Sequence, residues 1–313
     1  ENVSVTTGGE QGSTRISYTR FNQTGIMPNS EINRNTLDFS GTLNITDKLT
    51  ASAKAIYTKT NGLGRYGTGY DAENLMTNFR QWWAVNTDLA AQRDAYFSTG
   101  RNITWNPYGP DNLDAIYWDN PYFTRYENYN NDERNRLFGY TTLGYEFTDW
   151  FDVQGRVSVD SYSTIREERN NVGSVDIANY TRRNINFAEF NYDLFLNFDQ
   201  DFGDFGLNAT LGTNYRQTTV NSIAASTNGG LVFEGLYTLS NSANPINFPG
   251  ESEYDIRVLG LFGTASIDYD NTFFLEGSLR RDTFSTLADG QNAFNYPAIS
   301  TSIIFSNLFD SNA

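Results

Sequence analysis

The segment from Leu137 to Val159 alternates apolar and polar side chains with a period of two. One arm runs from Leu137 to Phe147, the other from Phe151 to Val159, and only Thr148-Asp149-Trp150 separates them. A turn this short joins only neighbouring antiparallel strands. Each arm has roughly ten residues, the length that crosses a bilayer as a tilted strand. The segment therefore predicts a β-hairpin of membrane-spanning length.

The same pattern recurs along the chain. The stretch from Leu37 to Tyr57 repeats the hairpin around a second Thr-Asp-x turn, Thr46-Asp47-Lys48. Similar alternating arms follow at Phe190–Tyr215, Leu259–Leu279 and Tyr296–Phe305, and Ser13–Phe21 is a weaker candidate. Together these segments indicate about ten strands.

The connections alternate between short turns and long loops. We expect the long ones at Asn22–Asn35, Lys59–Arg134, Ile165–Arg183 and Thr219–Tyr254, and around Gly290. This asymmetry is typical of outer-membrane barrels, as is the clustering of aromatic residues beside the short turns. The predicted fold is all-β, an antiparallel transmembrane β-barrel with short periplasmic turns and long extracellular loops. A soluble β-sheet with ordinary strand-end aromatics is the alternative interpretation.

Composition excludes several classes of protein. The 313 residues include no Cys and no His, which removes thiolate nucleophiles, zinc fingers and Ser-His-Asp triads. A formal net charge of -15 disfavours binding to nucleic acid, because that binding depends on Lys and Arg. If much of this charge faces a barrel lumen, it would disfavour anionic solutes. No apolar run is long enough for a transmembrane helix. We predict no cofactor and no metal.

The segment 59–134 interrupts the strand pattern and is predicted as a large extracellular loop insertion. Residues Asp71–Phe97 have helical spacing, which favours packing roles for Trp82 and Trp83, although a partner-facing role is the alternative. Four further aromatics could stack on sugar rings or contact a peptide, or could form the small core that holds the insertion together. They are Trp105, Tyr108, Tyr117 and Trp118.

The insertion also contains the acidic residues Asp111, Asp114, Asp119 and Glu127. A pair of carboxylates can serve glycoside hydrolysis, but spacing in the sequence does not establish the required separation. Ordinary loop carboxylates are the simpler interpretation, so the chain is not predicted to be an enzyme.

Several segments together resemble the barrel of the SusC/RagA family, TonB-dependent outer-membrane transporters typical of the Bacteroidetes. The resemblance extends from about Leu37 to Phe305, and the Leu-Arg-Arg-Asp segment ending at Asp282 is its most specific part. The matching segments are Gly260–Gly263, Tyr269–Asp282, Phe294–Ser300, Asn78–Asn86, Trp105–Pro107, Asn120-Pro121 and Gly155-Arg156 after its Thr-Asp-x turn.

The resemblance implies a location in the bacterial outer membrane and import of glycan (oligosaccharide) or peptide nutrients. It implies a SusD-like surface lipoprotein as partner, and energy from TonB-ExbB-ExbD through a plug. Such barrels have about 22 strands, so we expect residues 1–313 to form a section of a larger barrel, with plug and TonB box not visible in this sequence. A siderophore or cobalamin receptor and a passive porin are alternatives. A soluble carbohydrate-binding β-protein is an alternative of a different class.

Overall fold

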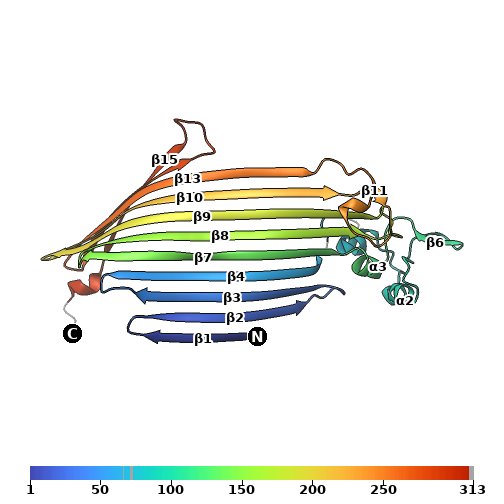
Figure 1. Cartoon of the computed structure of the whole chain (residues 1–313), viewed down its shortest axis with the longest axis horizontal. Helices are drawn as coiled ribbons and strands as arrows, with labels where there is room; N and C mark the ends of the chain where they lie inside the picture. Colours follow the sequence, from blue (N-terminus) through green and yellow to red (C-terminus); the bar gives the residue numbers. More distant parts are fainter. Residues whose placement is uncertain (66, 71–72, 310–313) are drawn as a thin grey trace.

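The computed structural model describes residues 1–65, 67–70 and 73–309. Its main feature is one 11-stranded sheet with the order β1-β2-β3-β4-β7-β8-β9-β10-β13-β14-β15 (Figure 1). Each neighbouring pair is antiparallel, as the repeated hairpins predicted. The strands are β1 (Asn2–Gly9), β2 (Gly12–Thr24), β3 (Glu31–Asn44), β4 (Leu49–Arg65), β7 (Asn130–Thr148), β8 (Phe151–Asn170), β9 (Asn179–Phe202), β10 (Phe205–Ser226), β13 (Gly250–Tyr269), β14 (Phe273–Phe284) and β15 (Ala293–Ile303).

The remaining elements lie in the connections. Helix α1 is a single turn that continues into the π-helix η1, and the segment 66–129 also holds a small hairpin and two further helices. Their bounds are α1 (Leu75–Thr77), η1 (Asn78–Trp82), α2 (Leu89–Thr99), β5 (Pro107–Gly109), β6 (Asn112–Ala115) and α3 (Pro121–Tyr126). Elsewhere lie β11 (Asn228–Leu231), η2 (Leu239–Asn241), β12 (Ser242–Asn244) and η3 (Phe305–Leu308).

The helical pattern expected over Asp71–Phe97 is divided in the structure. Residues 71 and 72 lie outside the described part of the chain. Trp83 is extended with φ -75° and ψ 125°, and it ends the first helical stretch. A new helix begins after Asp88, whose side chain accepts hydrogen bonds from the backbone N–H groups of Ala90 and Ala91. The described residues contain no helix that is long and apolar enough to cross a membrane.

Short turns and long loops lie at opposite ends of the sheet, as predicted (Figure 1). The long loops are shorter than expected, because β2, β3, β4, β7, β8, β9, β10 and β13 extend into segments expected as loops. The loop expected over 59–134 is thus narrowed to 66–129. The β2–β3 loop spans 25–30, the β8–β9 loop 171–178 and the β10–β13 segment 227–249. In these extensions polar residues occupy both faces and apolar ones such as Ile165, Val220 and Ile223 are scattered, so the regular alternation ends while backbone pairing continues. Strand β1 was missed because only Val3 and Val5 mark its alternation.

The register separates the sheet into an apolar face and a polar face. Leu143, for example, lies in one row with Ala51, Gly155 and Leu194 across four strands. Its neighbour Thr142 lies on the other face, in a row with Ser52, Arg156 and Asp193. Leu143 is 52% exposed and Thr142 only 7%. Large side chains that remain exposed on one continuous face require a nonaqueous environment.

The apolar face forms a belt with aromatic borders. At the long-loop border the hydroxyls of Tyr18 and Tyr57 donate to Asn35 and Asn135, at 2.7 and 2.9 Å. On β9 the belt extends from Phe190 to Phe202, about 40 Å along the strand, which spans about 30 Å of bilayer at a tilt of 35–45°. The short-turn border is lined by Tyr145, Phe147, Trp150, Phe151, Phe198, Phe202, Phe205, Tyr269 and Phe273.

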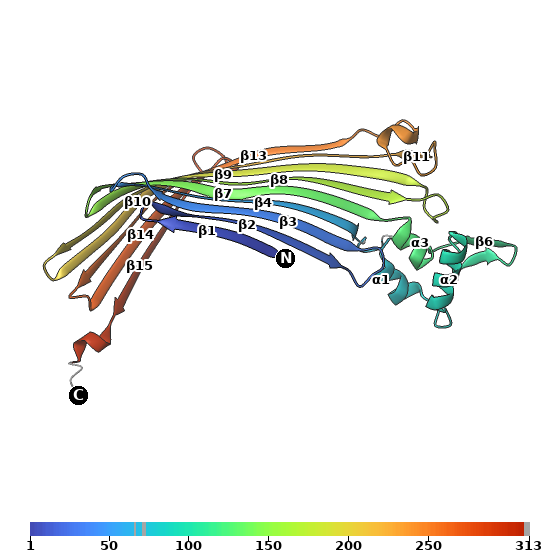
Figure 2. The same ribbon diagram turned by 60° about the horizontal axis from the view of Figure 1, so that its bottom comes forward.

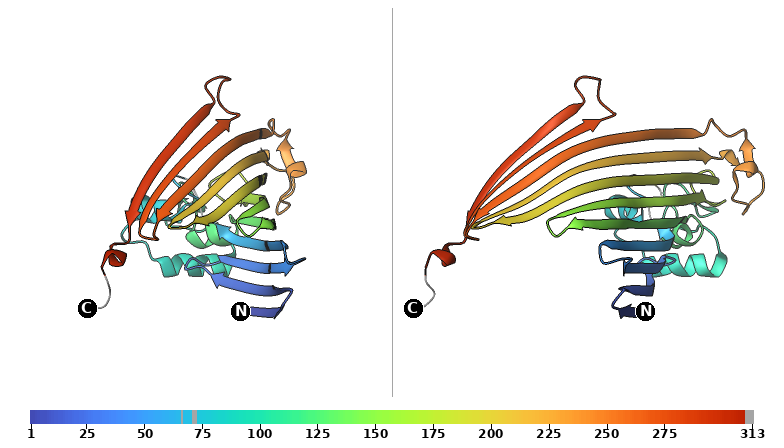
Figure 3. Two further views of the ribbon diagram at one scale, coloured as in Figure 1. Left: turned by 90° about the vertical axis from the view of Figure 1, so that its left-hand side faces the viewer. Right: turned by 60° about the vertical axis from the view of Figure 1, so that its left-hand side comes forward.

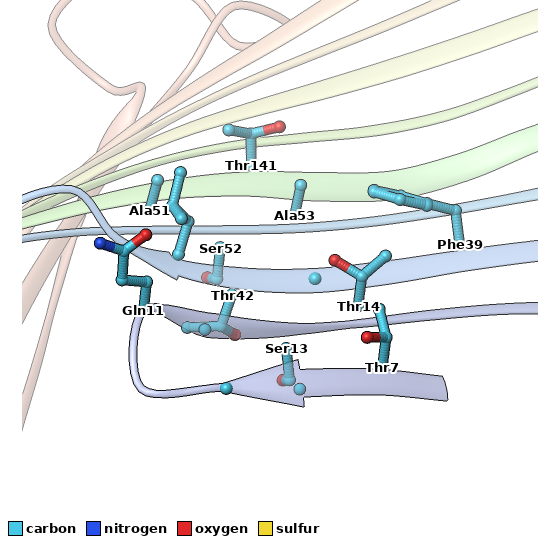
Figure 4. Close-up of a pocket in the computed structure, with 15 residues that line it drawn as sticks. Thr7, Gln11, Ser13, Thr14, Phe39, Thr42, Ala51, Ser52, Ala53 and Thr141 are labelled. Atoms are coloured by element: carbon cyan, nitrogen blue, oxygen red, sulfur yellow. The ribbon is translucent and has the colours of Figure 1, made fainter. Parts of the chain in front are cut away.

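The sheet is curved and open, with β1 and β15 as its edge strands (Figures 2 and 3). It is therefore not a small closed barrel within the described residues. Near β1–β4 the apolar face has a depression of about 560 Å³ between Phe39 and Leu43 (Figure 4). Small side chains, including Ala51 and Ala53, line it. The depression belongs to the apolar belt, since these residues share its rows.

Candidate functional site

The insertion between β4 and β7, residues 66–129, is organised around the buried carboxylate of Asp119. Its side chain is 3% exposed and accepts from Asn102 Nδ2 at 2.6 Å, Asn128 Nδ2 at 3.0 Å, the backbone N–H of Val175 at 2.8 Å and the hydroxyl of Ser174. Burial raises the pKa of Asp119, while the hydrogen bonds from Ser174, Val175 and Asn102 oppose that shift. Asp119 thus connects the insertion to the β8–β9 loop.

A second polar centre, Glu127, joins the same two loops to a third. Glu127 accepts from Tyr96 Oη at 2.7 Å and from Asn171 Nδ2 at 2.9 Å. Asn171 Oδ1 in turn accepts from Tyr237 Oη in the β10–β13 segment at 2.8 Å. Burial and the hydrogen bond to Glu127 raise the pKa of Tyr96. Three connections that are far apart in the sequence are therefore held as one assembly at the long-loop end.

Arg169, near the end of β8, lies between aromatic rings of two of these connections. Its guanidinium carbon is 3.4 Å from the ring centre of Tyr129 and 4.8 Å from that of Tyr237. Burial lowers the pKa of Arg169, and contact with ring faces partly offsets the cost of desolvating this cation. The negative charge of Glu127 acts against burial and raises the pKa of Arg169.

Arg125 attaches the insertion to the strand ends beneath it. Its side chain is 3% exposed and donates to the carbonyls of Pro28 at 3.1 Å and Gly64 at 2.7 Å. Asn29 completes the contact by donating from Nδ2 to the Arg125 carbonyl at 2.8 Å. Gly64 has φ +73°, and a Cβ there would lie 2.2 Å from the Asn29 carbonyl oxygen. Only glycine fits this contact without rearrangement.

The candidate aromatics form two pairs and two single residues. Trp82 stacks on Trp118 with ring centres 6.4 Å apart, and Trp83 contacts Trp105 edge-on at 6.3 Å. These pairs give the insertion a small aromatic core, although Trp82 stays 51% exposed. Tyr108 and Tyr117 are 65% and 69% exposed and are absent from the aromatic contacts of the described residues. Those two side chains remain available to a ligand or partner.

The candidate carboxylates have different surroundings. The carboxylates of Asp119 and Glu127 accept the hydrogen bonds described above and hold the loops together. Asp114 lies 3.7 Å from Arg101 with 72% of its side chain exposed, and Asp111 is exposed. Within residues 1–65, 67–70 and 73–309, no group of three or more acidic side chains is placed to hold a metal ion.

A second candidate region lies on the polar face of β2, β3, β4 and β7. A pocket of about 560 Å³ is lined by Arg34, Arg134 and Arg136, with Phe21 and Phe138 beside them. Sequence reasoning missed it, because these arginines are far apart along the chain. Their positions on the polar face of alternating strands are the signal that could have indicated it.

Charge is unevenly distributed along the polar face. Register places acidic side chains toward the short-turn end, including Asp199, Asp201 and Asp268. Toward the long-loop end the face carries several arginines, interspersed with the acids Asp132, Asp160, Glu168 and Glu189. The negative charge of the chain therefore does not make this face uniformly acidic.

Comparison with solved structures relates this sheet to known barrels. The RagAB peptide transporter matches 100% of this chain and 34% of that chain, with a TM-score of 0.78 and 13% identity. The siderophore receptor PiuA from Acinetobacter baumannii matches 96% of this chain and 43% of its own, with a TM-score of 0.53 and 12% identity. The ferric citrate transporter FecA matches 96% of this chain and 37% of its own, with a TM-score of 0.52 and 9% identity.

The fold is that of a section of the β-barrel found in these solved structures. The chain spans about a third of the length of the RagAB chain that it matches. The solved structures named above are transporters and receptors, not enzymes. No protein-family model matches the sequence, and no curated protein matches it. At 9–13% identity these similarities establish the fold.

Proposed function

We propose that this chain is part of the barrel of a SusC-like outer-membrane transporter that imports peptides or glycans. The observation that carries the proposal is the two-faced sheet, with an aromatic-bordered apolar belt on one side and charged residues on the other. A belt of this height fits a bilayer, and the polar face suits the passage of solutes. The TM-score of 0.78 to the peptide transporter, against 0.53 to the siderophore receptor, favours nutrient import over metal-chelate uptake.

In this function the long-loop end faces the outside of the cell. The assembly held by Asp119, Glu127 and Arg169 forms part of a preorganised mouth, with exposed Tyr108 and Tyr117 at its surface. Such exposed tyrosines suit contact with a peptide, a sugar or a SusD-like lipoprotein. Energy would come from TonB with ExbB and ExbD through a plug. The protein binds and conducts its cargo without covalent chemistry.

The test is uptake by cells that carry the full-length protein containing this chain. The protein should fractionate with the outer membrane and need detergent for extraction. Cells should take up fluorescent peptides or oligosaccharides only when the gene for this protein and that for TonB are both intact. Uptake that continues without TonB would indicate a passive porin. Uptake of ferric siderophores alone would indicate a metal-chelate receptor, and extraction without detergent would exclude a membrane barrel.

A further inference from the structure

A strip of arginines crosses the polar face near the long-loop end, and we define it by Arg34, Arg134, Arg166 and Arg183. Register aligns Arg34 on β3 with Thr60 on β4 and Arg134 on β7. In the next row of this face toward the loops, Arg166 on β8 lies between Asp132 on β7 and Arg183 on β9. These positions all lie beyond the long-loop border of the apolar belt.

None of the four has a carboxylate within ion-pair distance in the described part of the chain. Arg34 lies over the ring of Phe21 at 5.2 Å. Arg134 donates to Thr164 Oγ1 at 2.9 Å and lies over a tyrosine ring. By contrast, Arg136 makes two hydrogen bonds to Asp160, at 2.8 and 2.6 Å. Arg34 and Arg134 thus lack a carboxylate partner, in a row that holds no acid on β3, β4 or β7, whereas the neighbouring Arg136 has one.

This arrangement costs stability in the absence of an anion. Like charges directly opposite each other on antiparallel strands repel, and Arg166 and Arg183 are such a pair, with Asp132 opposite Arg166 on its other side. The nearest acid in the Arg34 pocket is Asp38, about 13 Å along β3. An excess of unpaired cations is unexpected in a chain of net charge -15. A bound anion would remove the repulsion.

The polar-face pocket lined by Arg34 and Arg134 indicates which chemical class of anion would fit. Arg34 and Arg134 both line it and lie two strands apart, about 10 Å between Cα atoms. Two guanidinium groups on side chains this long can converge on one carboxylate through paired hydrogen bonds. Phe21, Ile56 and Phe138 supply apolar surface in the same pocket. A carboxylate next to an apolar side chain is the chemistry of a peptide C-terminus.

We propose that Arg34 and Arg134, supported by Arg166 and Arg183, bind the C-terminal carboxylate of a peptide whose last side chain is apolar. The proposal rests on the proposed transport function and names its cargo more closely. Phe21 and Phe138 receive the last side chain, and the threonine hydroxyls of the pocket can donate to the carboxylate.

The experiment measures binding to the purified full-length protein in detergent. The probe is an alanine–glycine peptide that ends in phenylalanine, with either a free carboxylate or a C-terminal amide. The double variant Arg34→Gln/Arg134→Gln should weaken binding of the free acid by roughly tenfold or more, and should leave binding of the amide unchanged. Arg15→Gln is the matched control, since Arg15 lies on the same face, about 20 Å toward the short turns.

Equal losses for acid and amide would overturn the proposal, because the arginines would then act on the protein itself. No loss of acid binding would also overturn it, because the arginines would then not bind the carboxylate. An effect on oligogalacturonate but not on the free peptide would also overturn it and assign the strip to acidic glycans. TonB-dependent uptake of the amidated peptide by cells with the double variant separates the two levels. If that uptake persists while acid and amide bind alike, the transport function stands and the carboxylate site fails.

Discussion

Replacing Asp119 with alanine tests whether the loop assembly is built on one carboxylate. The side chain accepts four hydrogen bonds, from residues of the insertion and of the β8–β9 loop. Two of the donors, Asn102 and Asn128, are themselves only 8% and 4% exposed. In Asp119→Ala these donors would stay buried without an acceptor, which is the costly form of a lost hydrogen bond.

The size of the effect follows from that count. Each buried donor left without a partner costs about 1–3 kcal/mol, and removing the carboxylate recovers part of its own desolvation. That cost is real, since burial raises the pKa of Asp119 despite its hydrogen bonds. We therefore expect the assembly to lose about 3–5 kcal/mol, the range found when one partner of a buried charged network is removed. The sheet itself should keep its stability, because its strands pair independently of the loops.

The assay uses tryptophan fluorescence together with hydrogen exchange. Four of the five tryptophans, Trp82, Trp83, Trp105 and Trp118, lie in the insertion, and the fifth, Trp150, lies at the short-turn end of the sheet. In a Trp150→Phe background, fluorescence in denaturant follows the unfolding of the insertion apart from the sheet. Amides of segment 171–178 should exchange faster in parallel. Asp114→Ala is the control, because that side chain is 72% exposed and should leave both signals unchanged. Equal effects of the two substitutions, or protection unchanged in Asp119→Ala, would refute the reasoning.

Three further outcomes can be measured on the same protein. Leu211→Arg on the apolar face should destabilise the barrel in lipid vesicles by about 2–4 kcal/mol, whereas Thr210→Arg on the polar face should be tolerated; equal effects would contradict the assignment of faces. Arg125→Met should lose about 2–4 kcal/mol of insertion stability through its bonds to Pro28 and Gly64, seen as faster exchange at 25–30 and in α3; unchanged exchange would mean that Arg125 is no anchor. Because the pKa of Asp119 is raised, the folded assembly holds that proton more tightly than the unfolded chain. The free energy of unfolding of the assembly should therefore fall as pH rises from about 4 to the raised pKa of Asp119, and stay level above it. Asp119→Asn should abolish this slope in fluorescence-monitored unfolding. A slope that survives the substitution would assign the pH dependence to another group.

The barrel could be predicted from the sequence because lipid imposes a period of two on every strand that faces it. Leu137–Val159 shows that period clearly, and its pairing in the structure agrees. Beyond the belt the constraint ends, so the last residues of β8 and the first of β9 read as loop. The Thr-Asp-x turns were visible for the same reason as the strands, since apolar residues flank them on both sides.

The candidate site was far less accessible. Asp119 and Glu127 were recognised as acidic loop residues, but their partners Ser174, Asn171 and Tyr237 come from other connections. Sequence spacing carries no information on such contacts. The arginine strip is likewise formed by register across five strands, from β3 to β9, so it becomes visible only when the pairing is known.

The slanted course of the apolar belt determines how the strands cross the membrane. On β4 the long-loop border of the belt lies at Tyr57, and the row of Tyr57 reaches β13 at Asp255. On β13 the border itself lies at Leu259, four residues closer to the short turns. The short-turn border lies at Leu49 on β4, and the row of Leu49 reaches β13 at Gly263. On β13 the border lies at Tyr269, six residues further toward the short turns.

These shifts of about four to six residues over five strand spacings correspond to a tilt of about 35° from the membrane normal. A strand about 40 Å long at this angle moves about 23 Å sideways around the wall, the width of roughly four strands. The insertion therefore stands above turns that belong to other hairpins, and cargo that leaves it moving straight toward the cell passes strands well removed from β4 and β7.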